Sequence, residues 1–180
     1  MAVYKAPIKD IQFVLNEVLD VSSLAKLPGY EEATPDTIHA IVEEAAKLCE
    51  NVLFPLNRTG DEEGCHYENG VVRTTPGWSE AYQAFVEAGW NGLVFDPEWG
   101  GQGLPWLVNA AVQEMWHASN MSFGLCPMLT QGAIEALMIA GTDEQKAAYL
   151  PNLVSGEWTG TMNLTEPSAG SDLAAVRSRA

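Results

Sequence analysis

The sequence predicts a mainly α-helical domain followed by the first strand of a second, β-containing domain. The helices are indicated by long stretches in which apolar residues recur every three or four positions, bounded by proline, glycine or a capping side chain. The strand is indicated by alternation from Trp158 to Leu164, after a break at Gly156. We therefore expect an N-terminal extension at residues 1–33, a helical domain at 34–156 and the start of a β domain at 157–180.

The N-terminal extension contains one short amphipathic helix, because its apolar residues fall on a single stripe: Ile11, Val14, Leu15, Val18 and Leu19. A linker at Leu27–Tyr30 follows this helix. Thr34 and Pro35 then supply the N-cap and the first residue of a long helix, and Pro55 predicts its end.

Residues 57–74 are polar and contain glycine, so we expect a loop there. Within it, Asp61–Glu63 should be solvated and Val71–Val72 should form a short extended piece. Thr75 and Pro76 repeat the arrangement of cap and proline, and they predict that the next helix begins at this point.

The rest of the helical domain is interrupted by a glycine-rich loop at residues 89–104. After it, a strong helical period covers residues 108–119, and another covers residues 128–141. Thr142 and Gln145 form a capping box for one more helix.

Composition excludes several classes of partner. The formal net charge is −15, from 24 acidic and 9 basic residues, which gives no electrostatic footprint for nucleic acid and repels an anionic membrane. No apolar stretch approaches about 18 residues, so we expect no membrane span. The three cysteines are an odd count without CxxC or Cys/His spacing, which indicates neither a disulfide framework nor a metal site. With no recognisable targeting segment, we expect a cytoplasmic protein of bacterial origin.

The run Leu164–Asp172 joins the predicted strand to a loop suited to an anion. Pro167 and Gly170 end the strand, while Ser168, Gly170 and Ser171 combine small side chains with exposed backbone N–H groups that let the main chain approach a phosphate. The same residue types also form an ordinary strand-exit turn.

Three strings in order along the chain resemble signatures of the acyl-CoA dehydrogenase family, flavoenzymes that bind FAD and an acyl-CoA thioester. They are the glycine-rich loop, the segment from Ala140 to Glu157, and the run from Leu164 to Asp172. The extension, with Tyr4–Pro7 and Phe13–Leu15, is similar to that of one bacterial subgroup, the methylmercaptopropionyl-CoA dehydrogenases.

The resemblance implies α,β-dehydrogenation of an acyl-CoA, with a carboxylate removing the α-proton and a hydride passing to flavin N5. It also implies FAD as cofactor, an electron-transfer flavoprotein as electron acceptor, a homodimer or homotetramer, and a role in fatty acid metabolism. Because the family's catalytic glutamate lies in a C-terminal helical domain, we expect this chain to be an N-terminal part that is inactive alone, and we assign no catalytic residue in it.

Carried over to this sequence, the resemblance places FAD contacts at Met162, Leu164, Thr165, Gly170 and Ser171. The Leu164 N–H and the Thr165 hydroxyl would face the isoalloxazine ring, and Ser171 would lie near both FAD and the CoA part of the substrate. Met128 and Leu129 would line the acyl cavity, although apolar residues at helical spacing are more often plain core.

Three polar residues near these positions need separate treatment. Asn163 stands where the family pattern usually has Gly, Ala or Cys, which implies altered packing behind the flavin contact. Glu166 and Asp172 are better assigned to hydrogen bonds in a turn or helix cap than to proton abstraction.

Two other functions remain compatible with the sequence. An acyl-CoA oxidase or a flavin monooxygenase could use the same scaffold, and oxygen reactivity of the reduced flavin would distinguish it. A non-catalytic helical interaction module could keep only the fold, and would take up no FAD.

Overall fold

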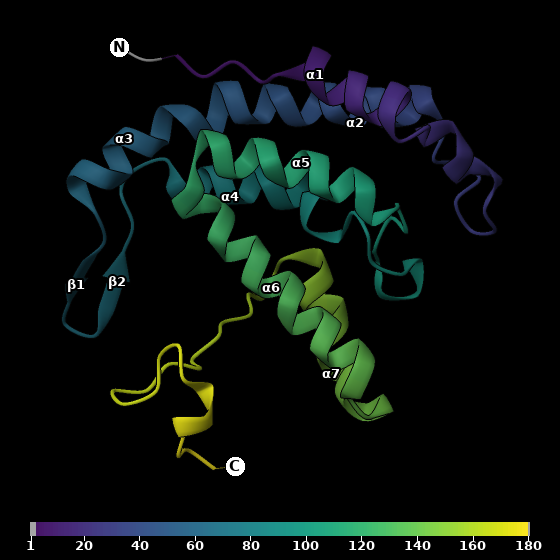
Figure 1. Cartoon of the computed structure of the whole chain (residues 1–180). Coiled ribbons are helices and arrows are strands. Elements are labelled where there is room, and N and C mark those ends of the chain that lie inside the picture. Colours follow the sequence, from purple (N-terminus) through teal and green to yellow (C-terminus); the bar gives the residue numbers. More distant parts are fainter. Residues whose placement is uncertain (1–2, 180) are drawn as a thin grey trace.

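A computed structural model describes residues 3–179 and confirms a mainly α-helical architecture (Figure 1). Residues 1, 2 and 180, at the outer ends of the predicted extension and β segment, lie outside the described part. The helices are α1 (Ile8–Phe13), α2 (Pro35–Leu48), α3 (Phe54–Glu63), α4 (Trp78–Glu87), α5 (Trp106–Ser119), α6 (Met121–Ala140) and α7 (Asp143–Ser155), and a hairpin of β1 (His66–Glu68) and β2 (Val71–Arg73) lies between α3 and α4.

The helix α5 is the centre of the main core, because it packs against α2 on one side and against α6 on the other. Its residues Val108, Val112 and Trp116 are fully buried. The Phe85 ring of α4 meets the Trp116 ring edge-on, with centroids 4.9 Å apart. Farther along the chain, α6 leads away from this core and packs against α7 (Figure 1).

The predicted N-terminal helix forms, but only part of its stripe is buried. Ile11 and Leu15 belong to the core, whereas Val14, Val18 and Leu19 are between 43% and 63% exposed. After α1 the chain continues into a π-helical turn at Val14–Val18. Val14 and Leu19 line an open hollow beside Leu107 and Ala111 of α5, so they remain accessible although they lie next to that helix.

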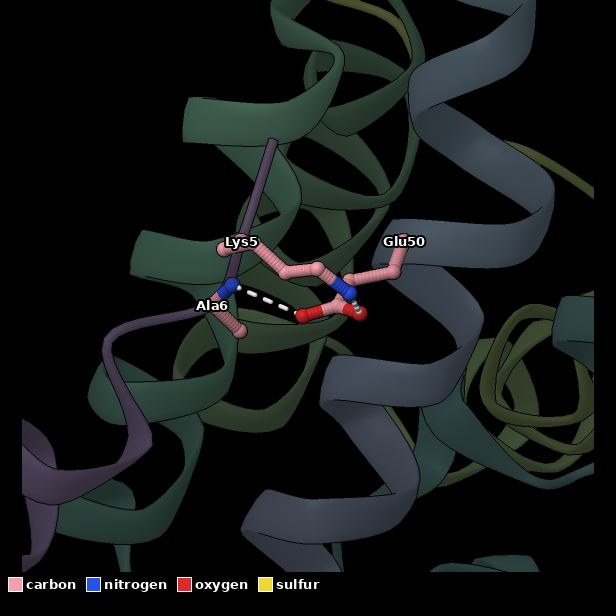
Figure 2. A network of polar contacts seen from close by, with 3 residues as sticks. All are labelled: Lys5, Ala6 and Glu50. Carbon is pink, nitrogen blue, oxygen red and sulfur yellow. Dashed lines mark hydrogen bonds and ion pairs between the residues drawn. The ribbon is translucent and has the colours of Figure 1, made fainter. Parts of the chain in front are cut away.

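The start of the extension is held by one carboxylate, as Figure 2 shows. The Glu50 carboxylate accepts a hydrogen bond from Lys5 Nζ at 2.7 Å and another from the Ala6 N–H at 3.0 Å. These contacts lower the pKa of Glu50, the Lys5 hydrogen bond most. Lys5 is exposed, and an ion pair in water adds little stability, so packing of the extension carries more of its attachment. Tyr4 contributes to that packing with a ring 6.0 Å from Phe54.

The predicted helix end at Pro55 is wrong. The chain passes from α2 through a π-helical turn at Cys49–Leu53 directly into α3, which ends at Glu63 before Gly64 with φ of +69°. A proline ring normally clashes with the carbonyl of the preceding turn, and the wider π turn removes that clash. Asp61–Glu63 is therefore helical and not a loop.

Two other sequence predictions around the hairpin have different outcomes. Val71–Val72 is extended as expected and pairs with β1, across a two-residue turn in which Asn69 and Gly70 both have positive φ. The start of α4 at Thr75 is wrong, because Gly77 adopts a φ of +91° and the helix begins only at Trp78.

The expectation that no apolar stretch approaches about 18 residues is wrong for α6. It has 20 residues with a mean hydropathy of 1.4, which is enough by length and composition to cross a membrane. A core helix of a globular domain has the same character, and α6 packs between α5 and α7. Its Gln131 is buried and hydrogen-bonds to Asn109 of α5.

The predicted strand at 158–164 is also corrected. These residues form no strand, and the isolated bridge between Glu166 and Ala169 follows them. A strand needs a neighbour that accepts and donates its backbone hydrogen bonds. Within residues 3–179 the only paired strands are β1 and β2, and neither pairs with this segment.

We predict that Gly101→Ala strongly destabilises the domain, whereas Gly132→Ala does not. A Cβ at residue 101 would lie 2.0 Å from the Phe95 carbonyl oxygen, while a Cβ at residue 132 would meet nothing within 4 Å. In urea unfolding we expect a loss of more than about 3 kcal/mol for the first variant. The second should gain about 0.5–1 kcal/mol from helix propensity. Equal unfolding midpoints would contradict this account of the loop.

Candidate functional site

The C-terminal end of α7 is held by a side chain from the glycine-rich loop. Asn91 is 1% exposed, and its Nδ2 donates to the carbonyls of Leu153 at 2.6 Å and Val154 at 3.2 Å. The last carbonyls of a helix have no partner inside the helix; Asn91 supplies one for Val154 and a second for Leu153, which also accepts from the Gly156 N–H at 3.2 Å. The Tyr82 hydroxyl of α4 adds a hydrogen bond of 2.8 Å to the carbonyl of Gly156, the residue that ends α7.

The glycines of the loop allow this close contact. A Cβ on Gly92 would lie 3.3 Å from both the Val154 side chain and its carbonyl oxygen. Backbone hydrogen bonds close the loop upon itself, from Gln102 N–H to Gly92 O at 2.9 Å and from Leu104 N–H to Leu93 O at 2.9 Å. The loop is thus a rigid platform beneath the end of α7.

Beyond Gly156 the chain crosses α6. The Trp158 N–H donates to Asn152 O of α7 at 3.0 Å. Two residues later, the Gly160 N–H donates to the Thr130 hydroxyl of α6 at 3.1 Å. A Cβ on Gly160 would lie 2.6 Å from the Ala133 Cβ, so the backbone runs directly over the helix.

The five residues expected to contact FAD lie on the segment after this crossing, which we call the cofactor segment (residues 161–172). All five are exposed, with Met162 at 64% and Leu164 at 44%. Every hydrogen bond of residues 161–179 is made inside that stretch. In Figure 1 this part, in yellow, leads away from the helices.

The turn at the centre of the cofactor segment is closed by its own polar groups. Glu166 and Ala169 exchange backbone hydrogen bonds of 3.1 Å. The Glu166 carboxylate also accepts from the backbone N–H groups of Ser178 at 2.8 Å and Arg177 at 2.9 Å. These hydrogen bonds lower the pKa of Glu166, and Ser178 contributes more to the lowering than Arg177 does. Asp172 similarly accepts from the Ala174 N–H, so both carboxylates are used as turn caps.

The cofactor segment has free donors beside apolar side chains. Within residues 3–179, neither the Leu164 N–H nor the Thr165 hydroxyl takes part in a hydrogen bond. Gly170 has neither a positive φ nor any atom within 4 Å of the Cβ that a larger residue would carry, so the space beside it is open. A flavin with its phosphates needs hydrogen-bond donors, apolar surface and accessible backbone. The cofactor segment offers all three and could therefore form one side of a flavin site.

The expected acyl-contact residues lie on α6, next to the start of this segment. Met128 is 39% exposed and Leu129 is half-buried. The Leu129 carbonyl lies 3.3 Å from the position of a Cβ on Gly160, so the structure brings Leu129 to the crossing point. No hydrogen bond among the described residues links Ser171 to α6.

Sequence reasoning missed the roles of Thr130, Asn91 and Tyr82. Thr130 and Asn91 are buried polar side chains in apolar surroundings, a combination that requires a partner but does not identify it. Gly160 carried a usable signal, because a glycine inside a strand-like run often marks the close approach of another backbone.

Other reactive groups give no site. Burial raises the pKa of Cys49 to about 12 and also raises that of Cys126, so neither thiol is a nucleophile at neutral pH. Across residues 3–179, no group of three His, Cys, Asp or Glu side chains could hold a metal ion.

Comparisons with known proteins agree on one family. The description "Acyl-CoA dehydrogenase, N-terminal domain" matches residues 35–157. The chain is 47% identical to the 3-methylmercaptopropionyl-CoA dehydrogenase of Ruegeria pomeroyi, covering 97% of this chain and 30% of that protein. It is 33% identical to a butyryl-CoA dehydrogenase of Syntrophomonas wolfei, covering 98% of this chain and 29% of that protein. The chain thus spans less than a third of the length of these relatives.

Solved structures share the fold. One is described as the electron transferring flavoprotein of Acidaminococcus fermentans, with a TM-score of 0.64 and 27% identity over 77% of this chain and 34% of that one. The butyryl-CoA dehydrogenase from Megasphaera elsdenii gives a TM-score of 0.63 over 76% of this chain and 34% of that one. At 23% identity, the second likeness concerns the fold alone.

We predict that Asn91→Ala destabilises the domain by about 1–3 kcal/mol, because it leaves the Val154 carbonyl without a partner and the Leu153 carbonyl with only the 3.2 Å hydrogen bond from the Gly156 N–H. Asn57→Ala is the matched control, since Asn57 is exposed on α3, and it should change stability by less than about 0.5 kcal/mol. Urea unfolding measures both variants. A small effect at Asn91 would mean that water or a shifted backbone satisfies these carbonyls.

We also predict that acid opens the turn of the cofactor segment. Because the pKa of Glu166 is lowered, the folded turn is favoured above the ordinary carboxyl range and loses this contribution as pH falls through the lowered pKa. In an NMR acid titration, the Arg177 and Ser178 amide signals should shift together with protonation of Glu166. Glu166→Gln should abolish that shift, and its persistence in the variant would contradict the assignment.

Proposed function

The chain belongs to the acyl-CoA dehydrogenase family, and from this we propose that it contributes one wall of an FAD site in a protein that dehydrogenates an acyl-CoA thioester. The single observation that carries the proposal is the pair of free donors at Leu164 and Thr165, beside exposed apolar side chains on the same segment. When bound, FAD would accept the hydride that leaves the β-carbon of the substrate.

The residues of the cofactor segment have distinct roles in this proposal. The Leu164 N–H and the Thr165 hydroxyl donate hydrogen bonds to polar atoms of the ring, and preoriented donors stabilise developing negative charge better than water does. The Met162 and Leu164 side chains cover apolar ring surface and exclude water. Gly170 and Ser171 provide open backbone and a hydroxyl for phosphate oxygens.

The α-proton is removed by a group outside the cofactor segment. Its two carboxylates, Glu166 and Asp172, are engaged with backbone N–H groups of the same turn. A base must reach the substrate carbon from a suitable distance, and the lowered pKa of Glu166 makes its carboxylate a weaker base. The chain by itself is therefore expected to be inactive.

The substrate is proposed to contact α6 near Met128 and Leu129, since Leu129 lies where the cofactor segment crosses that helix. The relatives' names include 3-methylmercaptopropionyl-CoA and butyryl-CoA dehydrogenases. An acyl-CoA is accordingly the proposed substrate class for this protein.

The remaining assignments follow from the family resemblance. The proposed electron acceptor is an electron-transfer flavoprotein, the proposed assembly is a homodimer or homotetramer, and the proposed role is in fatty acid metabolism. A cytoplasmic location is compatible with three cysteines that are all free thiols.

We predict that Thr165→Val weakens FAD binding in the protein that carries this chain. Valine keeps the volume of threonine but removes the hydroxyl, and loss of that hydrogen bond should cost about 1–3 kcal/mol, or roughly 5- to 150-fold in affinity. The measurements are flavin titration and the visible spectrum of the bound flavin. Thr74→Val is the control, because Thr74 is exposed beside the hairpin and should leave binding unchanged. Unaltered affinity and spectrum in Thr165→Val would reject this contact.

A further inference from the structure

We propose that Thr130 is a positioning residue, which sets the distance between α6 and the cofactor segment by holding the backbone at Gly160. This inference rests on the proposed function, in which the cofactor segment contacts the flavin and α6 contacts the acyl group. Thr130 touches neither group in this proposal. It acts through the chain that it anchors.

The hydroxyl of Thr130 has a fixed direction. Thr130 is fully buried, and its Oγ1 donates to the Cys126 carbonyl one helical turn earlier at 2.9 Å. A hydroxyl has one proton, so this hydrogen bond leaves only lone pairs for other partners. The Gly160 N–H uses one of them at 3.1 Å. The Thr130 hydroxyl is therefore oriented to accept a hydrogen bond from the Gly160 N–H.

Steric contact fixes the same point. A Cβ on Gly160 would lie 2.6 Å from the Ala133 Cβ and 3.2 Å from the Thr130 Cα. Only glycine permits the backbone to lie this close to α6 without displacing it. The hydrogen bond sets where Gly160 lies along α6. The absence of a side chain on Gly160 sets how closely its backbone approaches α6.

This contact between Gly160 and Thr130, which we call the joint, is the last hydrogen-bonded attachment of the cofactor segment to the helices within residues 3–179. After Gly160, all hydrogen bonds of residues 161–179 stay within that stretch. Thr130 also directly follows Leu129, which is expected to face the acyl group. A shift at the joint would therefore move the Leu164 and Thr165 donors relative to the acyl-contact residues, and a small misplacement of reacting groups is costly to binding and catalysis.

The test compares Thr130→Val with Thr130→Ser in the protein that carries this chain. Valine keeps the shape and removes the acceptor, whereas serine keeps the hydroxyl and loses a methyl group. Amide hydrogen exchange of a peptide covering residues 158–161 reports on the joint, and FAD titration reports on its consequence. For Thr130→Val we expect exchange to be faster and FAD affinity weaker, each by about tenfold.

For Thr130→Ser we expect both values to stay within about twofold of the wild type. The proposal is overturned if Thr130→Val leaves either measurement unchanged. It is also overturned if serine fails to rescue the loss, because the methyl packing and not the hydroxyl would then be responsible. A wild-type protein that takes up no FAD would instead reject the proposed function, and with it the cofactor role of Thr130, whatever the exchange data show about the joint.

Discussion

The arrangement of this domain depends on a buried amide that joins two distant parts of the chain. Asn91 donates to the carbonyls of Leu153 and Val154, more than sixty residues later. The Gly156 N–H also reaches the Leu153 carbonyl, but among the described residues the Val154 carbonyl has only Asn91 as a partner, and a buried carbonyl without one is costly. Because Asn91 ties the end of α7 to the glycine-rich loop, it also holds the point from which the following chain starts its path across α6.

The position of the candidate site then follows from a short series of contacts. Gly156 reverses the chain in a left-handed conformation under the Tyr82 hydroxyl, and Gly160 is held against α6 by Thr130. These contacts are rigid because they are buried or sterically closed. The cofactor segment beyond them keeps its hydrogen-bond donors free and its apolar side chains exposed, as expected for one wall of a site that a flavin completes.

Several features could be predicted from the sequence because short-range physics determines them. The capping box of Thr142 and Gln145 involves atoms only three residues apart, and it forms as expected. The buried faces of α4 and α5 follow their apolar periodicity. Glu166 and Asp172 cap their own turn, as their residue types suggested. The candidate cofactor residues came from the resemblance of a contiguous string, which needs no knowledge of the fold.

Only the tertiary structure decided how these pieces meet. Pro55 lies within a continuous helical path because a π turn relieves its clash, and periodicity does not reveal such a turn. Residues 158–164 do not form a strand, because strand formation requires a partner and alternation describes only one chain. The sequence by itself determined most of the helices, the caps at Thr34 and Thr142, and the candidate cofactor string. The partners of Asn91, Thr130 and Gly160 were decided by packing, since a buried hydrogen bond between distant residues leaves no local pattern in the sequence.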